Sequence, residues 1–90
     1  MKNPMRNFFQ RVLWDKSLDR KTVVVKILSR GFQGGIEEFT GESVTGVTRD
    51  GLLVVIGGVA KFIPFHRIIE IKCGGKVIFS KKESIYSFDV

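Results

Sequence analysis

The sequence predicts an α+β domain in which one N-terminal amphipathic helix packs on a bent antiparallel sheet, or on a small open β-barrel, of about six strands. Three observations predict this class. Apolar residues recur at helical spacing near the N-terminus, short β-branched runs follow, and glycine pairs separate several of these runs at hairpin spacing. Ninety residues suffice for one core, so 1–90 is expected to be a single domain.

The predicted helix covers residues 4–14. Asn3 is a favourable N-cap, and Pro4 suits the first helical position, where its missing N–H is not needed. The apolar side chains fall at i, i+3, i+4, i+7 and i+8, which is one stripe of a helix: Met5, Phe8, Phe9, Val12 and Leu13. We expect this stripe to face the sheet. Trp14 closes the helix, a position more typical of the edge of a core than of a platform for base stacking.

Residues 22–80 are rich in predicted strands. Residues 22–28 are apolar on both faces, which indicates a central strand. A short strand suits 36–39, and further strands are predicted at 43–48, 52–56, 59–63, 68–73 and 76–80, with turns at Asp50-Gly51, Gly57-Gly58 and Gly74-Gly75. Pro64 interrupts pairing and predicts a corner at 65–67. In the polar tail 81–90, the side chains suited to an edge strand or a partner contact are Ile85, Tyr86 and Phe88.

Charge is unevenly distributed along the chain, whose net charge is +6. Residues 1–30 hold eight basic and two acidic side chains. Residues 31–50 hold one basic and four acidic side chains, and residues 51–90 hold six basic and three acidic ones. Such a distribution favours a polyanionic partner, although solubility accounts for a moderate excess equally well. The single cysteine, Cys73, permits no intrachain disulfide, and no segment is apolar enough to span a membrane. A cytoplasmic protein is expected.

Motifs for common enzyme classes are missing from the sequence. It has no phosphate-binding P-loop, no dinucleotide-binding glycine motif, no nucleophile elbow and no cysteine-based metal site. Phosphodiester chemistry on cyclic phosphates commonly uses two histidines, and this chain has only His66. We therefore expect a binding protein, not an enzyme, without metal or cofactor. An enzyme acting on RNA ends would need a second catalytic group from another chain.

A first candidate anion site lies where the strand at 22–28 runs into a glycine-rich loop. Lys26 is in the strand, and Arg30-Gly31 follows it. A guanidinium group beside free backbone N–H groups binds phosphate oxygens well. The alternative is that Arg30 forms an ion pair with Glu37 or Glu38.

A second candidate site is the corner after Pro64. His66 and Arg67 stand between apolar residues there, and Lys61 and Phe62 come just before. A histidine ring donates to phosphate or stacks on a base. The alternative is that His66 bonds to backbone at a strand end. If the two sites are one, four side chains should lie close together: Arg30, Lys61, His66 and Arg67.

These stretches resemble a small archaeal protein family, the RNA cyclic group end recognition domain. The resemblance covers about residues 5–82. It rests on Leu13-Trp14-Asp15, on Arg30-Gly31, on Lys76-Val77-Ile78-Phe79 and, most specifically, on Ile63-Pro64-Phe65-His66-Arg67-Ile68. The family usually has His where this chain has Ser29. The resemblance implies binding of RNA ends that bear a 2′,3′-cyclic phosphate, with four positions of this chain matching the family's site: Arg30, Gly31, His66 and Arg67.

The leading hypothesis is a non-catalytic RNA-binding module that acts in RNA processing or repair. A cyclic phosphate carries one negative charge and no terminal hydroxyl, so a site made only of donors suits it. The expected RNA-binding residues are Arg30, Gly31, His66, Arg67, Lys61 and Lys26. The alternative is a protein-interaction subunit or small homodimeric scaffold with an apolar interface, favoured by the eight phenylalanines. A partner protein in RNA processing fits either hypothesis.

Overall fold

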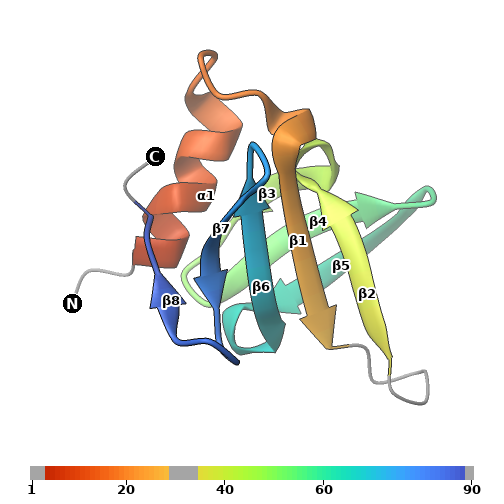
Figure 1. Ribbon diagram of the computed structural model, residues 1–90. Helices are drawn as coiled ribbons and strands as arrows, with labels where there is room; N and C mark the ends of the chain where they lie inside the picture. The colour runs from red at the N-terminus through yellow and green to blue at the C-terminus, as the bar shows by residue number, and fades with distance from the viewer. Residues whose placement is uncertain (1–3, 29–34, 89–90) are drawn as a thin grey trace.

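The computed structural model describes residues 4–28 and 35–88 (Figure 1). The elements in chain order are the helix α1 (Pro4–Trp14), the 3-10 turn η1 (Arg20–Thr22), β1 (Val23–Leu28), β2 (Ile36–Thr40), η2 (Gly41–Ser43), β3 (Val44–Val47), β4 (Gly51–Ile56), β5 (Val59–Pro64), η3 (Phe65–Arg67), β6 (Ile68–Cys73), β7 (Lys76–Ser80) and β8 (Ile85–Tyr86). The predicted α+β class is confirmed. The described part of the chain holds eight strands, where the sequence predicted about six.

The strands form two antiparallel sheets. One has the order β2-β1-β6-β7-β8, and the other has the order β3-β4-β5. In Figure 1 the five-stranded sheet lies in front of the three-stranded sheet, and α1 runs along one side of both. The sheets bend over a shared core without closing into a barrel. β1 pairs with both β2 and β6, as predicted for a central strand.

The apolar stripe of α1 packs into this core, as the sequence predicted. Met5, Phe8, Phe9 and Val12 are buried, and Leu13 packs at the margin. The same core also holds buried residues of both sheets, among them Val25, Ile27, Leu52, Val54, Ile63, Ile71 and Ile78. In the tail, β8 pairs with β7, and the ring of Phe88 lies 5.8 Å from the ring of Phe8 and 5.8 Å from that of Phe79. The tail therefore completes the core within the same chain.

The prediction for Trp14 is wrong. Its side chain is 80% exposed, so it does not form the edge of the core. Residue 14 follows Phe8 by six positions, which in a helix of 3.6 residues per turn places it on the opposite face from the buried stripe. No helix among the described residues combines the length and the apolar character that crossing a membrane requires.

The glycine pairs at 57–58 and 74–75 form the predicted hairpin turns, with all four residues at positive φ. The turn predicted at Asp50-Gly51 differs. The N–H of Thr48 donates to the carbonyl of Gly51 at 2.8 Å, so Arg49 and Asp50 occupy the centre of the turn and Gly51 begins β4. A Cβ on Gly51 would lie 2.3 Å from the carbonyl oxygen of Ile63. Close packing against β5, not turn geometry, therefore requires this glycine.

Candidate nucleic-acid interface

Several chain segments meet at one edge of the five-stranded sheet. Because neighbouring strands run in opposite directions, β1 and β7 end at the edge where β2 and β6 begin (Figure 1). The 3-10 turn η3 lies at this edge, directly before β6. We call the surface formed by Leu28, His66, Arg67, Lys81 and Lys82 the corner surface.

The sequence explains why the chain turns sharply at η3. Pro64 has φ −60° and ψ 143°, an extended conformation that its ring favours, and it has no N–H to continue pairing. The N–H of Phe65 donates instead to the carbonyl of Asp50 at 3.0 Å, which ties the corner to the turn before β4. The predicted corner at 65–67 is confirmed. It leaves His66 exposed and Arg67 half-buried.

Arg67 joins the corner to the end of β1. Its Nε and Nη2 donate to the carbonyl oxygen of Leu28 at 3.0 and 2.6 Å. A guanidinium group has five N–H donors, so three remain that these two bonds do not use. The arrangement fixes the plane of the guanidinium group while leaving donors for a ligand.

The His66 backbone is held from the other side by Lys81. The Lys81 Nζ donates to the carbonyl oxygen of His66, and the Lys81 N–H donates to the carbonyl of Ile69 at 3.1 Å. The imidazole ring is exposed and makes no hydrogen bond with another described residue, so its two ring nitrogens are open to solvent. The alternative prediction, that the His66 ring bonds to backbone at a strand end, is therefore wrong for the described residues.

Lys81 was missed by the sequence interpretation, although a signal for it exists. The turn at Gly74-Gly75 pairs Cys73 with Lys76. The register shifts by one residue between Ile71 and Lys72, so that Glu70 pairs with Ser80. The next residue, Lys81, must then lie beside Ile69 and close to the corner. Counting outward from the turn without this shift would have placed Lys81 beside Ile68, one residue away and still next to the corner.

Lys26 lies on the outward face of β1, where its charge is already compensated. Its Nζ is 3.0 Å from Glu70 Oε2, and the strand register places it between Glu70 on β6 and Glu38 on β2. The hydrogen bond to Glu70, followed by the charges of Glu70 and Glu38, raises the pKa of the Lys26 ammonium group. Lys26 therefore contributes less to the attraction of a polyanion than the sequence indicated.

Lys61 is not joined to the corner surface. It is exposed on β5, where it pairs in register with Val54, and it makes no hydrogen bond or ion pair with any described residue. Arg30, Gly31 and Ser29 lie outside the described residues, so the grouping of Arg30 with His66 and Arg67 stays a prediction.

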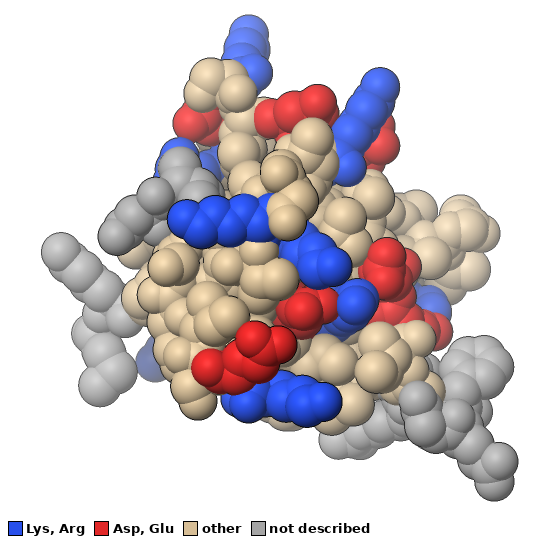
Figure 2. Space-filling view, viewed as in Figure 1, with Lys and Arg blue, Asp and Glu red and all other residues tan. Residues whose placement is uncertain are grey.

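The outer face of the five-stranded sheet is not a continuous basic surface. Figure 2 shows acidic and basic side chains interleaved across it. The interleaving follows from the strand register, which sets Lys26 between two glutamates. Within residues 4–28 and 35–88, no three His, Cys, Asp or Glu side chains gather so that they could hold a metal ion.

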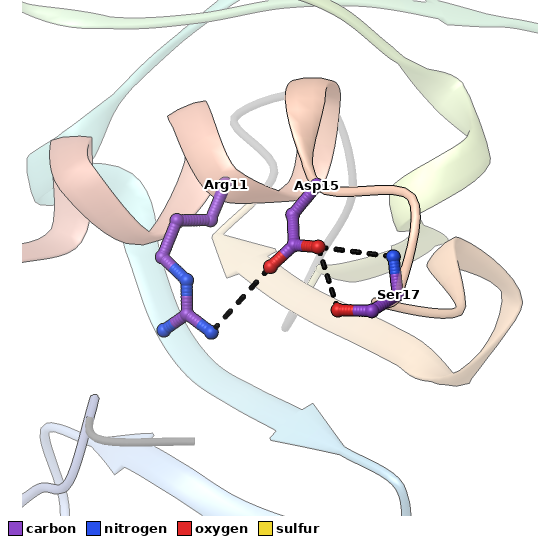
Figure 3. Close-up of polar contacts among 3 residues, drawn as sticks. All are labelled: Arg11, Asp15 and Ser17. Atoms are coloured by element: carbon purple, nitrogen blue, oxygen red, sulfur yellow. Dashed lines mark hydrogen bonds and ion pairs between the residues drawn. The ribbon is translucent and has the colours of Figure 1, made fainter.

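The end of α1 is fixed by a small polar cluster (Figure 3). Asp15 Oδ1 accepts hydrogen bonds from the Ser17 backbone N–H at 2.9 Å and from its hydroxyl at 2.6 Å, and Oδ2 lies 3.9 Å from Arg11 Nη2. These hydrogen bonds, assisted by the charge of Arg11, lower the pKa of the Asp15 carboxyl group. Asp15 thus holds the turn that follows Trp14.

Comparisons with known proteins give one family model and several relatives. The family model described as the MJ1316 RNA cyclic group end recognition domain matches residues 1–81. A UPF0248 protein of Pyrobaculum islandicum is 35% identical over 79 residues, which are 87% of this chain and 89% of that protein. A UPF0248 protein of Pyrobaculum aerophilum is 30% identical over 88% of this chain and all of its own length. A UPF0248 protein of Methanopyrus kandleri is 31% identical over 78% of this chain and 89% of its own length.

No solved structure matches the chain. The family model covers nearly the whole sequence, and the Ile63–Ile68 stretch that carried the resemblance forms the corner described above. The chain therefore belongs to the MJ1316 RNA cyclic group end recognition domain family.

Proposed function

We propose that this protein is a non-catalytic RNA-binding module that recognises RNA ends bearing a 2′,3′-cyclic phosphate, in RNA processing or repair. One observation carries the proposal. The guanidinium group of Arg67 is oriented by the Leu28 carbonyl, keeps three N–H donors for a ligand, and lies in the same short turn as the exposed His66. The family's description supports the choice of ligand.

The chemistry of the corner surface suits a phosphate. Arg67 and Lys81 are cations, and the His66 ring offers an N–H donor. Hydrogen bonds from charged donors to phosphate oxygens are roughly twice as strong as neutral ones. With one histidine in the chain, the module is proposed to hold the cyclic phosphate without opening it.

The test compares one short RNA in three forms, ending in a hydroxyl, a linear phosphate or a 2′,3′-cyclic phosphate. Binding is measured by fluorescence anisotropy at low and physiological salt. Attraction by charge alone favours the linear phosphate, which carries more negative charge than the cyclic one. Tightest binding of the cyclic end therefore indicates recognition of its shape and of its acceptor oxygens by donors of the protein. Equal binding of all three ends contradicts end recognition but leaves RNA binding, and no binding at low salt overturns the proposal.

A second function, self-association, is favoured by one specific observation. The outward face of the β4–β5 hairpin exposes Leu53 (44%) and Phe62 (46%), which pair in register, and Val55 (39%) beside them. Residues 51–64 carry a single charge, Lys61, so this face has little charge with which to bind a charged partner. An apolar face of this kind suits the same face on a second copy of the protein. Sedimentation analysis at rising concentration should then detect a dimer that Phe62→Gln abolishes. A wild-type monomer at every concentration would exclude it.

A further inference from the structure

A pocket of about 490 Å³ opens beside the corner surface. Its walls come from β1, β2, β6, the end of β7 and the turn that follows β7. The volume falls within the range of roughly 300–1,000 Å³ that is usual for small-molecule sites. A bound molecule of nucleotide size therefore fits.

The pocket and the corner surface share a residue. Lys81 lines the pocket, and its Nζ donates to the carbonyl oxygen of His66. Lys82 lines the pocket as well. A terminal nucleotide whose phosphate lies at the corner surface would thus have its base within reach of the pocket.

The lining suits a flat ring with hydrogen-bond donors on its edge. Ile36, which is 58% exposed, and Ile69 supply apolar contact for a ring face. Two carboxylates, Glu70 and Glu83, also line the pocket. Glu70 is paired with Lys26 at 3.0 Å, whereas the Glu83 carboxylate makes no hydrogen bond or ion pair with any described residue. Glu83 is therefore the acceptor available to a ligand.

The turn that presents Glu83 is fixed in a costly conformation. The Glu83 N–H donates to the hydroxyl of the buried Ser80 at 3.2 Å. The next residue, Ser84, has φ +54°, in the left-handed region that residues other than glycine rarely adopt. Such conformations concentrate at binding and catalytic sites.

We propose that this pocket binds the base of the terminal nucleotide and that Glu83 makes it prefer guanine; the proposal rests on the RNA-end binding proposed above. Guanine presents two adjacent donors, N1–H and N2–H₂, which one carboxylate accepts together. Uracil presents a single N–H between two carbonyl oxygens, which repel a carboxylate. Unstacked RNA bases are generally read in this way, by contact with their faces and hydrogen bonds to their edges.

The experiment uses two short RNAs that differ only in the last base, G or U, each with a 2′,3′-cyclic phosphate. Dissociation constants are measured for the wild-type protein, for Glu83→Gln and for Glu42→Gln, which removes an exposed carboxylate outside the pocket. We expect a G-over-U preference of roughly tenfold in the wild type and Glu42→Gln, and about twofold or less in Glu83→Gln. The ratio is the readout because removing any acidic charge strengthens RNA binding in general.

The outcomes separate this proposal from the one beneath it. If both RNAs bind the wild type equally, or if Glu83→Gln keeps the preference, the base pocket is overturned while RNA binding stands. If neither RNA binds, the proposed function fails and the pocket fails with it. A direct readout is the shift of the Ile36 and Ile69 methyl signals on addition of guanosine 2′,3′-cyclic phosphate, which uridine 2′,3′-cyclic phosphate should produce only weakly.

Discussion

The guanidinium group of Arg67 binds the carbonyl oxygen of Leu28 through two hydrogen bonds, from Nε at 3.0 Å and from Nη2 at 2.6 Å. The two residues are 39 positions apart in the sequence. The contact ties the turn before β6 to the end of β1 and fixes the plane of a group that is proposed to bind phosphate. Arg67 is thus expected to influence both stability and RNA binding.

Substitution of Arg67 separates these two effects. In Arg67→Lys the charge remains, but one ammonium group cannot replace the two-donor contact. We expect the free energy of unfolding to fall by about 0.5–1.5 kcal/mol, as measured by urea denaturation. Arg67→Ala should in addition weaken binding of a cyclic-phosphate RNA by roughly ten- to a hundredfold, the loss of a charge-assisted hydrogen bond. RNA affinity at the wild-type level in Arg67→Ala would place the phosphate elsewhere.

Lys61 and Lys81 form a matched pair, since each alanine substitution removes one exposed positive charge. Lys81→Ala also removes the bond to the His66 carbonyl, whereas the Lys61 ammonium group makes no hydrogen bond or ion pair with any described residue. We expect Lys81→Ala to weaken RNA binding severalfold at physiological salt. Lys61→Ala should change it about twofold or less, because exposed charges at a distance are screened. Fluorescence anisotropy measures the RNA affinity of both variants. A larger loss of affinity in Lys61→Ala than in Lys81→Ala would show that the RNA runs along β5.

Gly51 and Gly46 test the packing between β4 and its neighbours. In Gly51→Ala the new methyl group would lie 2.3 Å from the backbone oxygen of Ile63. We therefore expect the free energy of unfolding to fall by about 1–3 kcal/mol or more. In Gly46→Ala it would lie 3.3 Å from the end of the Leu53 side chain, which is able to move. That variant should be near neutral by thermal denaturation. Similar melting temperatures for the two variants would refute the account of Gly51.

Asp15 predicts a pH dependence. Its hydrogen bonds from Ser17, together with Arg11, lower its pKa in the folded protein. A carboxyl group with a lowered folded pKa stabilises the fold at pH values above its ordinary pKa, and this contribution is lost as the pH falls through the folded pKa. Asp15→Ala should therefore lower the melting temperature at neutral pH, and its difference from wild type should shrink in acid. A difference that is constant from neutral to strongly acidic pH would contradict the assignment.

Local signals made the helix and two of the turns predictable from the sequence. The helix depends on the apolar stripe from Met5 to Val12, and the hairpin turns depend on the glycine pairs at 57–58 and 74–75. In each case the residues that determine the structure are close together in the sequence. Gly51 was misread because its requirement comes from Ile63 on another strand. β2 and β8 were less evident because each depends on its pairing partner, and β2 buries only Phe39.

The candidate site was harder to predict because it depends on strand register. Lys61 is near His66 in the sequence yet lies along β5, whereas Lys81 is fifteen residues away and bonds to it. Lys26 was expected to attract RNA, but its pairing with Glu70 is visible only when β1 and β6 are aligned. Distances across a hairpin, not distances along the chain, determine which charges meet.

The RNA-binding surface can be located by a map of backbone amide shifts when the isotope-labelled protein is titrated with a short RNA that ends in a 2′,3′-cyclic phosphate. We predict that the largest shifts occur at Leu28, at residues 66–69 and at Lys81 and Lys82, while the β4–β5 hairpin and α1 change little. Largest shifts at Leu53 and Phe62, or at α1, would contradict the account and move the RNA-binding surface away from the corner.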